Sequence, residues 1–346
     1  MPSPADFQIV NPLNCPGWDD LVLSSGNYSF FQTSAWAKVL FESYNYEPSF
    51  FAQSRNGKIS IVIPLMEVNS FITGRRAVSL PFSDYCEPVV LDKSSTFELP
   101  RGLIDTAKKK GWKYLDFRSR DVFAPGIPVW SRFLCHNLEL SRPEDLLSKF
   151  HTNAVRNLKR ARESGLRVGV FDSFEAMRQY YRLHCLTRKR QGVPPQPFSF
   201  FRKIFDHICS KGGGRLVLAH YYDRPVAGGV FFHFGRKAMY KFGAADMNFP
   251  RLGASTAVIW EAMNRYAAEG YQTFCFGRTD IGNEGLRRFK IGFGSDEYLL
   301  DYHRFDVSMG VFIESNEECR PSFSWLIKHV PTPGLKLIGL VYRHFG

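Results

Sequence analysis

Residues 270–280 read GYQTFCFGRTD, and residues 111–121 read GWKYLDFRSRD. The two stretches align without a gap. In both, an aromatic residue follows the glycine, a phenylalanine stands six positions after the glycine, and an aspartate stands ten positions after it. Self-similarity of this kind indicates a repeated structural unit. Because each stretch contains a predicted strand, the pair predicts an internal duplication of a mixed α/β unit.

The elements around the two stretches follow the same order. Alternating residues on both sides of Asn56-Gly57, in residues 50–68, predict a hairpin before the first copy. A second hairpin is predicted around Asp223-Arg224, in residues 215–235, and a helix is predicted in residues 255–270. Hairpin, strand, helix and strand thus recur in both halves of the chain, as a duplication requires.

Length and cysteine usage limit the class of protein. A chain of 346 residues is longer than one core usually organises, so two domains are expected. The predicted fold class is mixed α/β (α+β), with domains in residues 1–145 and 146–306 and a tail in residues 307–346. Seven isolated cysteines argue against a metal site and a disulfide framework. No signal peptide and no apolar run of about 18 residues occurs, which predicts a cytoplasmic protein.

The formal net charge of +12 favours an anionic partner, such as nucleic acid, a phosphate-bearing substrate or an acidic membrane surface. Part of this charge lies on a helix predicted in residues 151–165, where Arg156 and Arg160 are one turn apart and opposite an apolar face. The two arginines either hold the phosphates of a nucleotide-linked or lipid-linked substrate or form the solvated side of an amphipathic helix.

Five segments of the chain resemble, in this order, the peptidoglycan bridge-forming aminoacyltransferases of the FemABX type and the wider FemAB-like group. They are NAVRNLKRARESGL (153–166), LTRKRQGVPPQPFSFF (186–201), VAGGVFFHFGRKAMYKFGA (226–244), WEAMNRYAAEGYQTFCFGRTD (260–280) and EGLRRFKIGFGSDE (284–297). The resemblance implies two tandem GNAT-like (acyl-CoA N-acyltransferase) domains. It also implies transfer of an activated acyl or aminoacyl group onto an amine, with no bound cofactor.

The chain departs from the family's patterns in two ways, and both concern the donor. The sequence contains no long heptad run. Family members that contact charged tRNA do so through a long coiled-coil arm, which needs such a run. The loop that binds pyrophosphate in acetyl-CoA-dependent members corresponds to NFPRLGAST (248–256), which offers only Arg251, Gly253 and Ala254. Backbone N–H groups at a helix N-terminus can still bind phosphate. The co-substrate is therefore either aminoacyl-tRNA or acyl-CoA.

Residues 276–294, FGRTDIGNEGLRRFKIGFG, predict a charged, glycine-rich loop at the end of a strand. Acyl transfer passes through a tetrahedral intermediate whose oxyanion needs a fixed cation or N–H donors. Lys290 lies between aromatic residues and is followed by glycines, so its ammonium group is expected to point into a cleft. The resemblance implies a catalytic lysine here, at the acyl and phosphate groups. The alternative is a lysine that extends along a surface helix.

Other polar side chains are expected to line the same cleft. Asp280 either orients the attacking amine or pairs with an arginine. A guanidinium can hold phosphate with two parallel hydrogen bonds. The predicted substrate-binding residues of the second domain are Arg156, Arg160, Thr187, Arg188, Tyr240, Arg278, Arg287 and Arg288.

The first copy lacks a counterpart of the segment that contains Lys290, so it is expected to be catalytically inert and to shape the acceptor site. Its best candidates for acceptor contacts are Asp84 and Tyr85. In residues 322–346, apolar and basic residues alternate around two prolines. This tail either packs on the domains or lies on the inner membrane surface as a peripheral contact.

Three functions compete. In the first, the protein transfers an aminoacyl or acyl group onto an amine of a cell-wall (peptidoglycan) precursor, with charged tRNA as a partner. In the second, it is an acyl-CoA-dependent N-acyltransferase that acts on an amino sugar in exopolysaccharide or envelope biosynthesis. In the third, it is a non-catalytic binding protein on the same fold, which the dense charges of residues 276–294 argue against.

Overall fold

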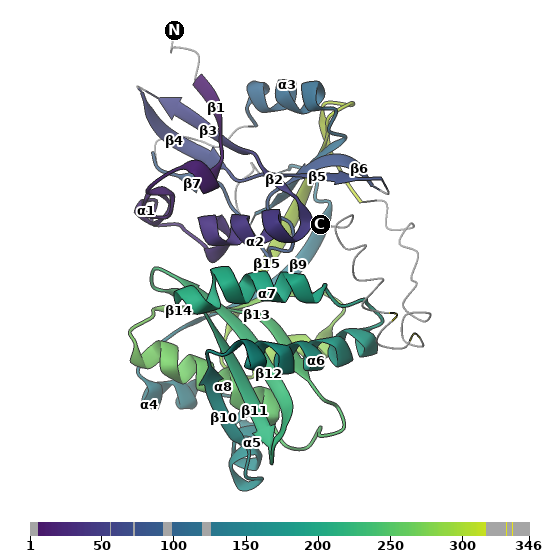
Figure 1. The fold of residues 1–346 in the computed structure, drawn as a ribbon. Helices are drawn as coiled ribbons and strands as arrows, with labels where there is room; N and C mark the ends of the chain where they lie inside the picture. The colour runs from purple at the N-terminus through teal and green to yellow at the C-terminus, as the bar shows by residue number, and fades with distance from the viewer. Residues whose placement is uncertain are drawn as a thin grey trace. The chain divides into compact units, whose positions relative to one another are not determined.

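The computed structural model of the protein describes residues 6–55, 57–71, 73–92, 99–119, 126–315, 330 and 334 (Figure 1). The described residues divide into two compact units. The first holds residues 6–133 and 299–315, and the second holds residues 134–298. Asn56, Asp121 and most of the predicted tail lie outside the described residues. The predicted domain boundary at residue 145 remains a prediction.

The first unit contains short helices and many strands (Figure 1). Its helices are η1 Pro12–Asn14, α1 Trp18–Ser24, η2 Phe30–Gln32, α2 Ser34–Tyr44 and α3 Arg101–Lys110. Its strands are β1 Asp6–Val10, β2 Glu47–Pro48, β3 Phe50–Arg55, β4 Lys58–Ile63, β5 Met66–Ser70, β6 Gly74–Val78, β7 Val89–Val90, β8 Tyr114–Arg118 and β16 Val311–Ile313. Strands β9 Ser131–Glu139 and β15 Asp296–Asp306 continue from one unit into the other.

The second unit carries longer helices. Its helices are α4 Pro143–Leu146, η3 Leu147–Lys149, α5 Thr152–Glu163, α6 Phe174–Gln191, α7 Phe198–His207, η4 Cys209–Lys211, α8 Ala254–Ala268 and α9 Glu284–Ile291. Its own strands are β10 Arg167–Phe171, β11 Gly214–Tyr221, β12 Arg224–Phe234, β13 Lys237–Ala245 and β14 Thr273–Asp280.

The duplication predicted from the sequence is present in the topology. In the first unit the predicted hairpin β3–β4 lies in a separate four-stranded sheet, and hairpin β5–β6 takes its place. Hairpin β5–β6 is followed by β7, α3 and then β8, which pairs parallel to β6. In the second unit, hairpin β12–β13 is followed by α8 and then by β14, which pairs parallel to β13. Gly111 and Gly270 follow the two helices with φ of 66° and 81°, a backbone conformation that glycine adopts without steric cost.

Both predicted hairpins form, with one shift. Strands β3 and β4 pair up to Arg55 and Lys58, inside a four-stranded sheet of order β1-β3-β4-β7. In the second hairpin Tyr221 pairs with Arg224, so the turn residues are Tyr222 and Asp223 rather than Asp223 and Arg224. Tyr222 adopts a φ of 52°, which a two-residue turn between antiparallel strands requires.

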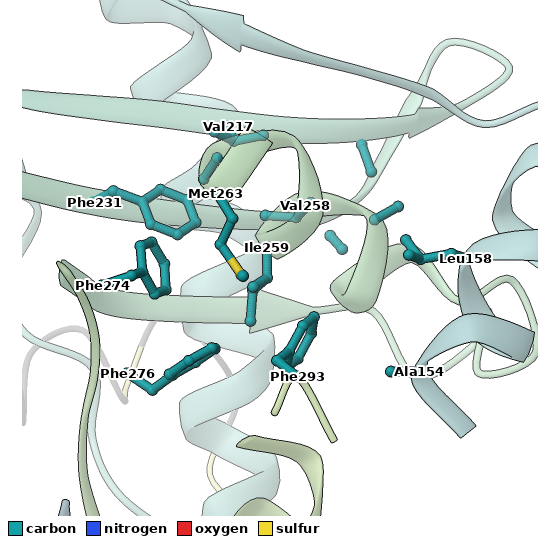
Figure 2. Packing of buried hydrophobic residues seen from close by; sticks show 14 of the residues in the cluster. Ala154, Leu158, Val217, Phe231, Val258, Ile259, Met263, Phe274, Phe276 and Phe293 are labelled. Atoms are coloured by element: carbon teal, nitrogen blue, oxygen red, sulfur yellow. The ribbon is translucent and has the colours of Figure 1, made fainter. Parts of the chain in front are cut away.

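The core of the second unit lies between its sheet and helices α5 and α8. The sheet order in this unit is β10-β11-β12-β13-β14-β9. Figure 2 shows Met263 of α8 against Phe231 and Phe274 of the sheet, and Leu158 of α5 at the edge of the same cluster. The apolar spacing of both helices therefore buries one stripe of each.

The opposite face of this sheet is covered by α6 and α7. Phe242 of β13 packs against Phe200 and Phe201 of α7, with ring centroids 5.9 and 5.4 Å apart. His184 of α6 lies in this aromatic layer, is 3% exposed, and has Nε2 2.8 Å from Oε1 of Gln196. His184 is therefore a core residue of the second unit. Burial, followed by the charge of Arg188, lowers the pKa of His184 to about 3.

Acid should destabilise the protein partly through His184. The unfolded chain binds a proton near pH 6.5 and the folded chain near pH 3, so stability is full above pH 6.5 and falls between these values. Between pH 7 and pH 5 the loss from this group is about 2 kcal/mol. Urea unfolding of His184→Gln, which cannot ionise, should show a correspondingly weaker dependence on pH. Replacement of the exposed His151 by glutamine should leave the dependence unchanged; equal slopes for all three proteins would contradict the assignment.

Helix α6 begins after Ser173, whose hydroxyl accepts a hydrogen bond from the Ala176 amide at 3.2 Å. One local prediction needs correction. The predicted loop in residues 276–294 contains helix α9, which Asn283 caps by accepting a hydrogen bond from the Leu286 amide. Among the described helices, none is long and apolar enough to cross a membrane.

Candidate functional site

Strands β13 and β14 separate after a short parallel pairing. The register joins Lys237–Met239 to Thr273–Cys275, whereas β13 continues to Ala245 and β14 to Asp280. Beyond the pairing, the two strands make no ladder hydrogen bonds with each other. The N–H and C=O groups along a strand edge can form hydrogen bonds with another chain, so these edges can bind an extended ligand.

A pocket of about 150 Å³ lies at the N-terminus of α8. The N-cap residue Gly253 has a φ of 66° and supplies no side-chain hydrogen bond to the first turn. The first amides of α8 and its dipole therefore favour an anion at this end. The lining residues are Asn157, Val226, Ala245, Asp246, Met247, Phe249, Pro250, Gly253, Ala254, Ser255, Thr256 and Phe289.

Helix α5 contacts this end of α8 through its backbone. A Cβ atom on Gly253 would lie 2.1 Å from the carbonyl oxygen of Asn157, so only glycine permits this approach. Asn157 lies between the predicted binding residues Arg156 and Arg160, and both arginines are exposed. Arg156 donates to Oδ1 of Asn153 at 2.9 Å, and within the described part of the chain neither arginine forms an ion pair. The structure thus places the basic helix beside the pocket.

Lys290 is buried, with only 2% of its surface exposed. Its Nζ donates to the carbonyl oxygens of Gly277 and Arg278 at 2.8 and 2.9 Å. Successive carbonyls of a regular strand point to opposite sides. Gly277 has a φ of 70°, which breaks this alternation and turns both oxygens toward the same ammonium group. The sequence predicts that the ammonium group of Lys290 points into a cleft. In the structure the group is instead buried against the two carbonyl oxygens near the end of β14.

The charged residues around Lys290 differ in their surroundings. Arg278 and Asp280 are exposed on the last residues of β14, and Arg288 is exposed on α9, where its Nε lies 3.3 Å from the Glu284 carbonyl oxygen. Arg287 instead forms two hydrogen bonds with Glu297, at 2.7 and 2.8 Å. These hydrogen bonds raise the pKa of Arg287.

Three further predicted residues lie on α6 and β13. The Thr187 hydroxyl is buried, donates to the Ala245 carbonyl at 3.3 Å and accepts from the Ala245 amide at 3.0 Å. It therefore ties α6 to the end of β13. Arg188 lies 3.3 Å from Oε1 of Gln191. Tyr240 lies on the part of β13 that has left β14, with its ring 5.2 Å from Phe231, and burial raises its pKa.

Asp84 and Tyr85 belong to the first unit. The Asp84 carbonyl accepts a hydrogen bond from the Tyr302 hydroxyl at 2.5 Å, and the Tyr85 ring packs edge-on against Phe31. Just before them, Leu80 has a φ of 53°, a conformation that costs a branched residue energy. Nη1 of Arg118 donates to the carbonyls of Leu80 and Ser83 at 3.1 and 3.0 Å and holds this bend.

Sequence reasoning missed His136 and Glu297. The buried His136 has Nε2 3.0 Å from Oε2 of Glu297, the same carboxylate that binds Arg287. The two residues are 161 positions apart and lie on different strands. Nothing in the local sequence marks either of them.

Comparison with known proteins gives the fold a context. Residues 148–298 match the family model described as an acetyltransferase (GNAT) domain. The crystal structure of FemX is similar with a TM-score of 0.65 and 15% sequence identity, over 86% of this chain and 96% of that chain. No curated protein matches this chain in sequence.

Two further solved structures resemble the chain over most of its length. One is the C-terminal domain of a putative lysylphosphatidylglycerol synthetase from Agrobacterium fabrum, with a TM-score of 0.53, 16% identity and coverage of 82% and 91% of the two chains. The other is a tandem GNAT protein from the clavulanic acid biosynthesis pathway, with a TM-score of 0.52, 10% identity and coverage of 88% and 99%. The predicted mixed α/β fold, a FemABX-like duplicated GNAT fold, is confirmed.

Proposed function

We propose that the protein moves an aminoacyl or acyl group onto an amine of a cell-wall precursor. The observation that carries the proposal is the parting of β13 and β14 next to the uncapped N-terminus of α8. Parted strand edges can hold an extended acyl carrier, and the α8 pocket can hold its phosphates. The similarity of the fold to FemX supports a cell-wall acceptor.

The reaction forms a C–N bond between the acceptor amine and the acyl carbonyl carbon. The bond from that carbon to the sulfur or oxygen of the carrier breaks, and the proton lost by the amine ends on this leaving group. We assign to Lys290 the stabilisation of the developing oxyanion, because its charge is fixed at the end of β14. We assign to Asp280, exposed on the same strand, the orientation of the amine.

The remaining arginines are assigned to anionic parts of the substrates. Arg156 and Arg160 are exposed on α5 beside the α8 pocket, and we assign them to the phosphates of a nucleotide-linked or lipid-linked substrate. Arg278 and Arg288 supply positive charge near Lys290. Arg188 of α6 and Tyr240 of β13 are assigned to acceptor contacts. The acceptor role of Asp84 and Tyr85, which lie in the first unit, stays a prediction from the sequence. A cytoplasmic location is part of the proposal, either with or without a peripheral contact at the inner membrane face.

Acyl-CoA is the second candidate donor, and the α8 pocket favours it. A volume of about 150 Å³ at a helix N-terminus suits a small phosphate group. With this donor, the enzyme would acylate an amino sugar during exopolysaccharide or envelope assembly. A binding protein without activity is the third candidate.

Replacing both Arg156 and Arg160 with alanine should raise the KM of the phosphate-bearing substrate by about 10-fold and leave kcat within about twofold, because phosphate contacts act on binding. The dependence of KM on salt should also become weaker. Arg162→Ala is the matched control, since Arg162 is exposed on α5 two residues beyond Arg160 and faces another side. A KM unchanged in the double variant would contradict the assignment.

A transfer assay with two labelled donors tests the function. Purified protein receives a nucleotide-linked muramyl pentapeptide and a pool of amino sugars, together with either labelled aminoacyl-tRNA or labelled acyl-CoA. Label that moves from tRNA to the muramyl peptide supports bridge formation. Label that moves only from acyl-CoA supports the N-acyltransferase. Transfer from neither donor, by protein that is folded by circular dichroism, supports the binding protein.

A further inference from the structure

The carboxylate of Glu297 joins three elements of the second unit. Its two oxygens accept hydrogen bonds from Nη2 and Nε of Arg287 on α9, at 2.8 and 2.7 Å. One of these oxygens also lies 3.0 Å from Nε2 of His136 on β9. The hydrogen bonds from Arg287 lower the pKa of Glu297, so the carboxylate is charged at neutral pH. A single anion from β15 thus fixes a helix and a neighbouring strand.

His136 is the uncharged member of this group. Its side chain is fully buried, and burial, followed by the charge of Lys290, lowers its pKa. A neutral imidazole beside a carboxylate carries its proton on the nitrogen that faces the carboxylate, which is Nε2. Nδ1 is then an acceptor only, and within the described residues it has no hydrogen-bond partner. His136 therefore donates a hydrogen bond to Glu297 without adding positive charge, and the carboxylate is neutralised by Arg287 of α9.

Helix α9 carries Arg287 and Lys290, which are three residues apart and lie one helical turn from each other. Helix α9 has eight residues and is too short to be stable without tertiary contacts. The helix is held at one side by the hydrogen bonds from Lys290, in its last turn, to the β14 carbonyls, and at the other side by the hydrogen bonds from Arg287, just before that turn, to Glu297. Phe289, between them, lines the pocket at the N-terminus of α8.

We propose that Glu297 is a positioning residue for Lys290. By holding Arg287 and His136, it fixes α9 one turn before Lys290, and so keeps the Lys290 ammonium group on the carbonyls of Gly277 and Arg278. The positioning follows from these contacts; its effect on turnover rests on the proposed function.

The first test needs no activity. A water-soluble amine-reactive reagent is applied, and modification of Lys290 is followed by mass spectrometry. Glu297→Ala should modify at least about 10-fold faster than the wild type, because local opening exposes the amine. Glu297→Gln, which keeps one acceptor oxygen, should be intermediate. Glu284→Ala is the matched control: Glu284 is exposed and also pairs with Arg287, at 3.3 Å, but does not contact His136, so Lys290 should stay protected.

The second test measures turnover with whichever donor supports transfer. Glu297→Ala should lower kcat by about 10- to 100-fold with KM values within about threefold, as expected for a displaced catalytic group. Glu297→Gln should recover part of this loss. In a Lys290→Met background, Glu297→Ala should lower kcat by less than about twofold, because a residue that acts through Lys290 has no further effect without it.

The outcomes separate the two proposals. Equal labelling of Lys290 in Glu297→Ala, Glu297→Gln and the wild type overturns the positioning role, whatever the activity. An additive loss of kcat in the Lys290→Met background overturns it as well. If the wild type transfers from neither donor, the proposed function fails, and the labelling result still decides whether Glu297 positions Lys290.

Discussion

Replacing Lys290 with methionine is expected to lower kcat by about 100- to 1,000-fold, the usual cost of losing one group that stabilises an oxyanion. Methionine matches the length of the lysine side chain but has no charge and no N–H donor. The donor KM should change little if Lys290 acts mainly in the transition state. Steady-state kinetics with both substrates varied checks the result.

The same replacement should also destabilise the protein. In the structure Lys290 is 2% exposed and donates to the carbonyls of Gly277 and Arg278. Methionine leaves these oxygens without this donor, which costs about 2–3 kcal/mol in unfolding free energy. Urea unfolding measures this loss of stability separately from the loss of turnover. Lys211→Met, at an exposed lysine of η4, is the control and should change neither quantity. Full turnover by Lys290→Met would exclude a catalytic role.

Replacing Gly253 with alanine is expected to raise the donor KM by at least about 10-fold and to lower the unfolding free energy by about 2–4 kcal/mol. The new methyl group would lie 2.1 Å from the Asn157 carbonyl oxygen, so α5 and α8 must move apart. This movement opens the pocket that both helices line. Alanine at a φ of 66° adds backbone strain. Donor titration and urea unfolding measure the two effects.

Gly270→Ala is a control that separates the cost of backbone strain from the cost of the close contact with Asn157. Gly270 also has a positive φ, 81°, but a Cβ atom there would meet nothing within 4 Å. Its replacement should cost only the conformational term, about 1 kcal/mol, and leave the donor KM unchanged. If Gly253→Ala behaves like Gly270→Ala in both measurements, close contact between α5 and α8 is not what shapes the pocket.

The fold could be predicted from local patterns because they recur. The glycine, aromatic residue and phenylalanine shared by residues 111–117 and 270–276 mark a helix end and a parallel strand in each unit. A hairpin depends on a short turn between two alternating strands, and both signals are local in the sequence. The turns of hairpins β3–β4 and β11–β12 could therefore be predicted to within one residue. Helix α9 was not predicted because the many glycines and charged residues in residues 276–294 are more typical of a loop. The helix begins at the cap Asn283, which accepts a hydrogen bond from the Leu286 amide.

The sequence by itself determined the duplication, the basic character of α5 and the segment that carries Lys290, because each depends on neighbouring residues. Only the tertiary structure decided what these side chains contact. It set Lys290 on the carbonyls of β14, paired Arg287 with Glu297, and brought Asn157 of α5 to Gly253. The physical reason is the sequence distance over which each feature is decided. A helix or strand follows from the spacing of residues that are close in the sequence. A buried polar group instead pairs with whatever the folded chain brings near it, as His136 does with Glu297, 161 positions away.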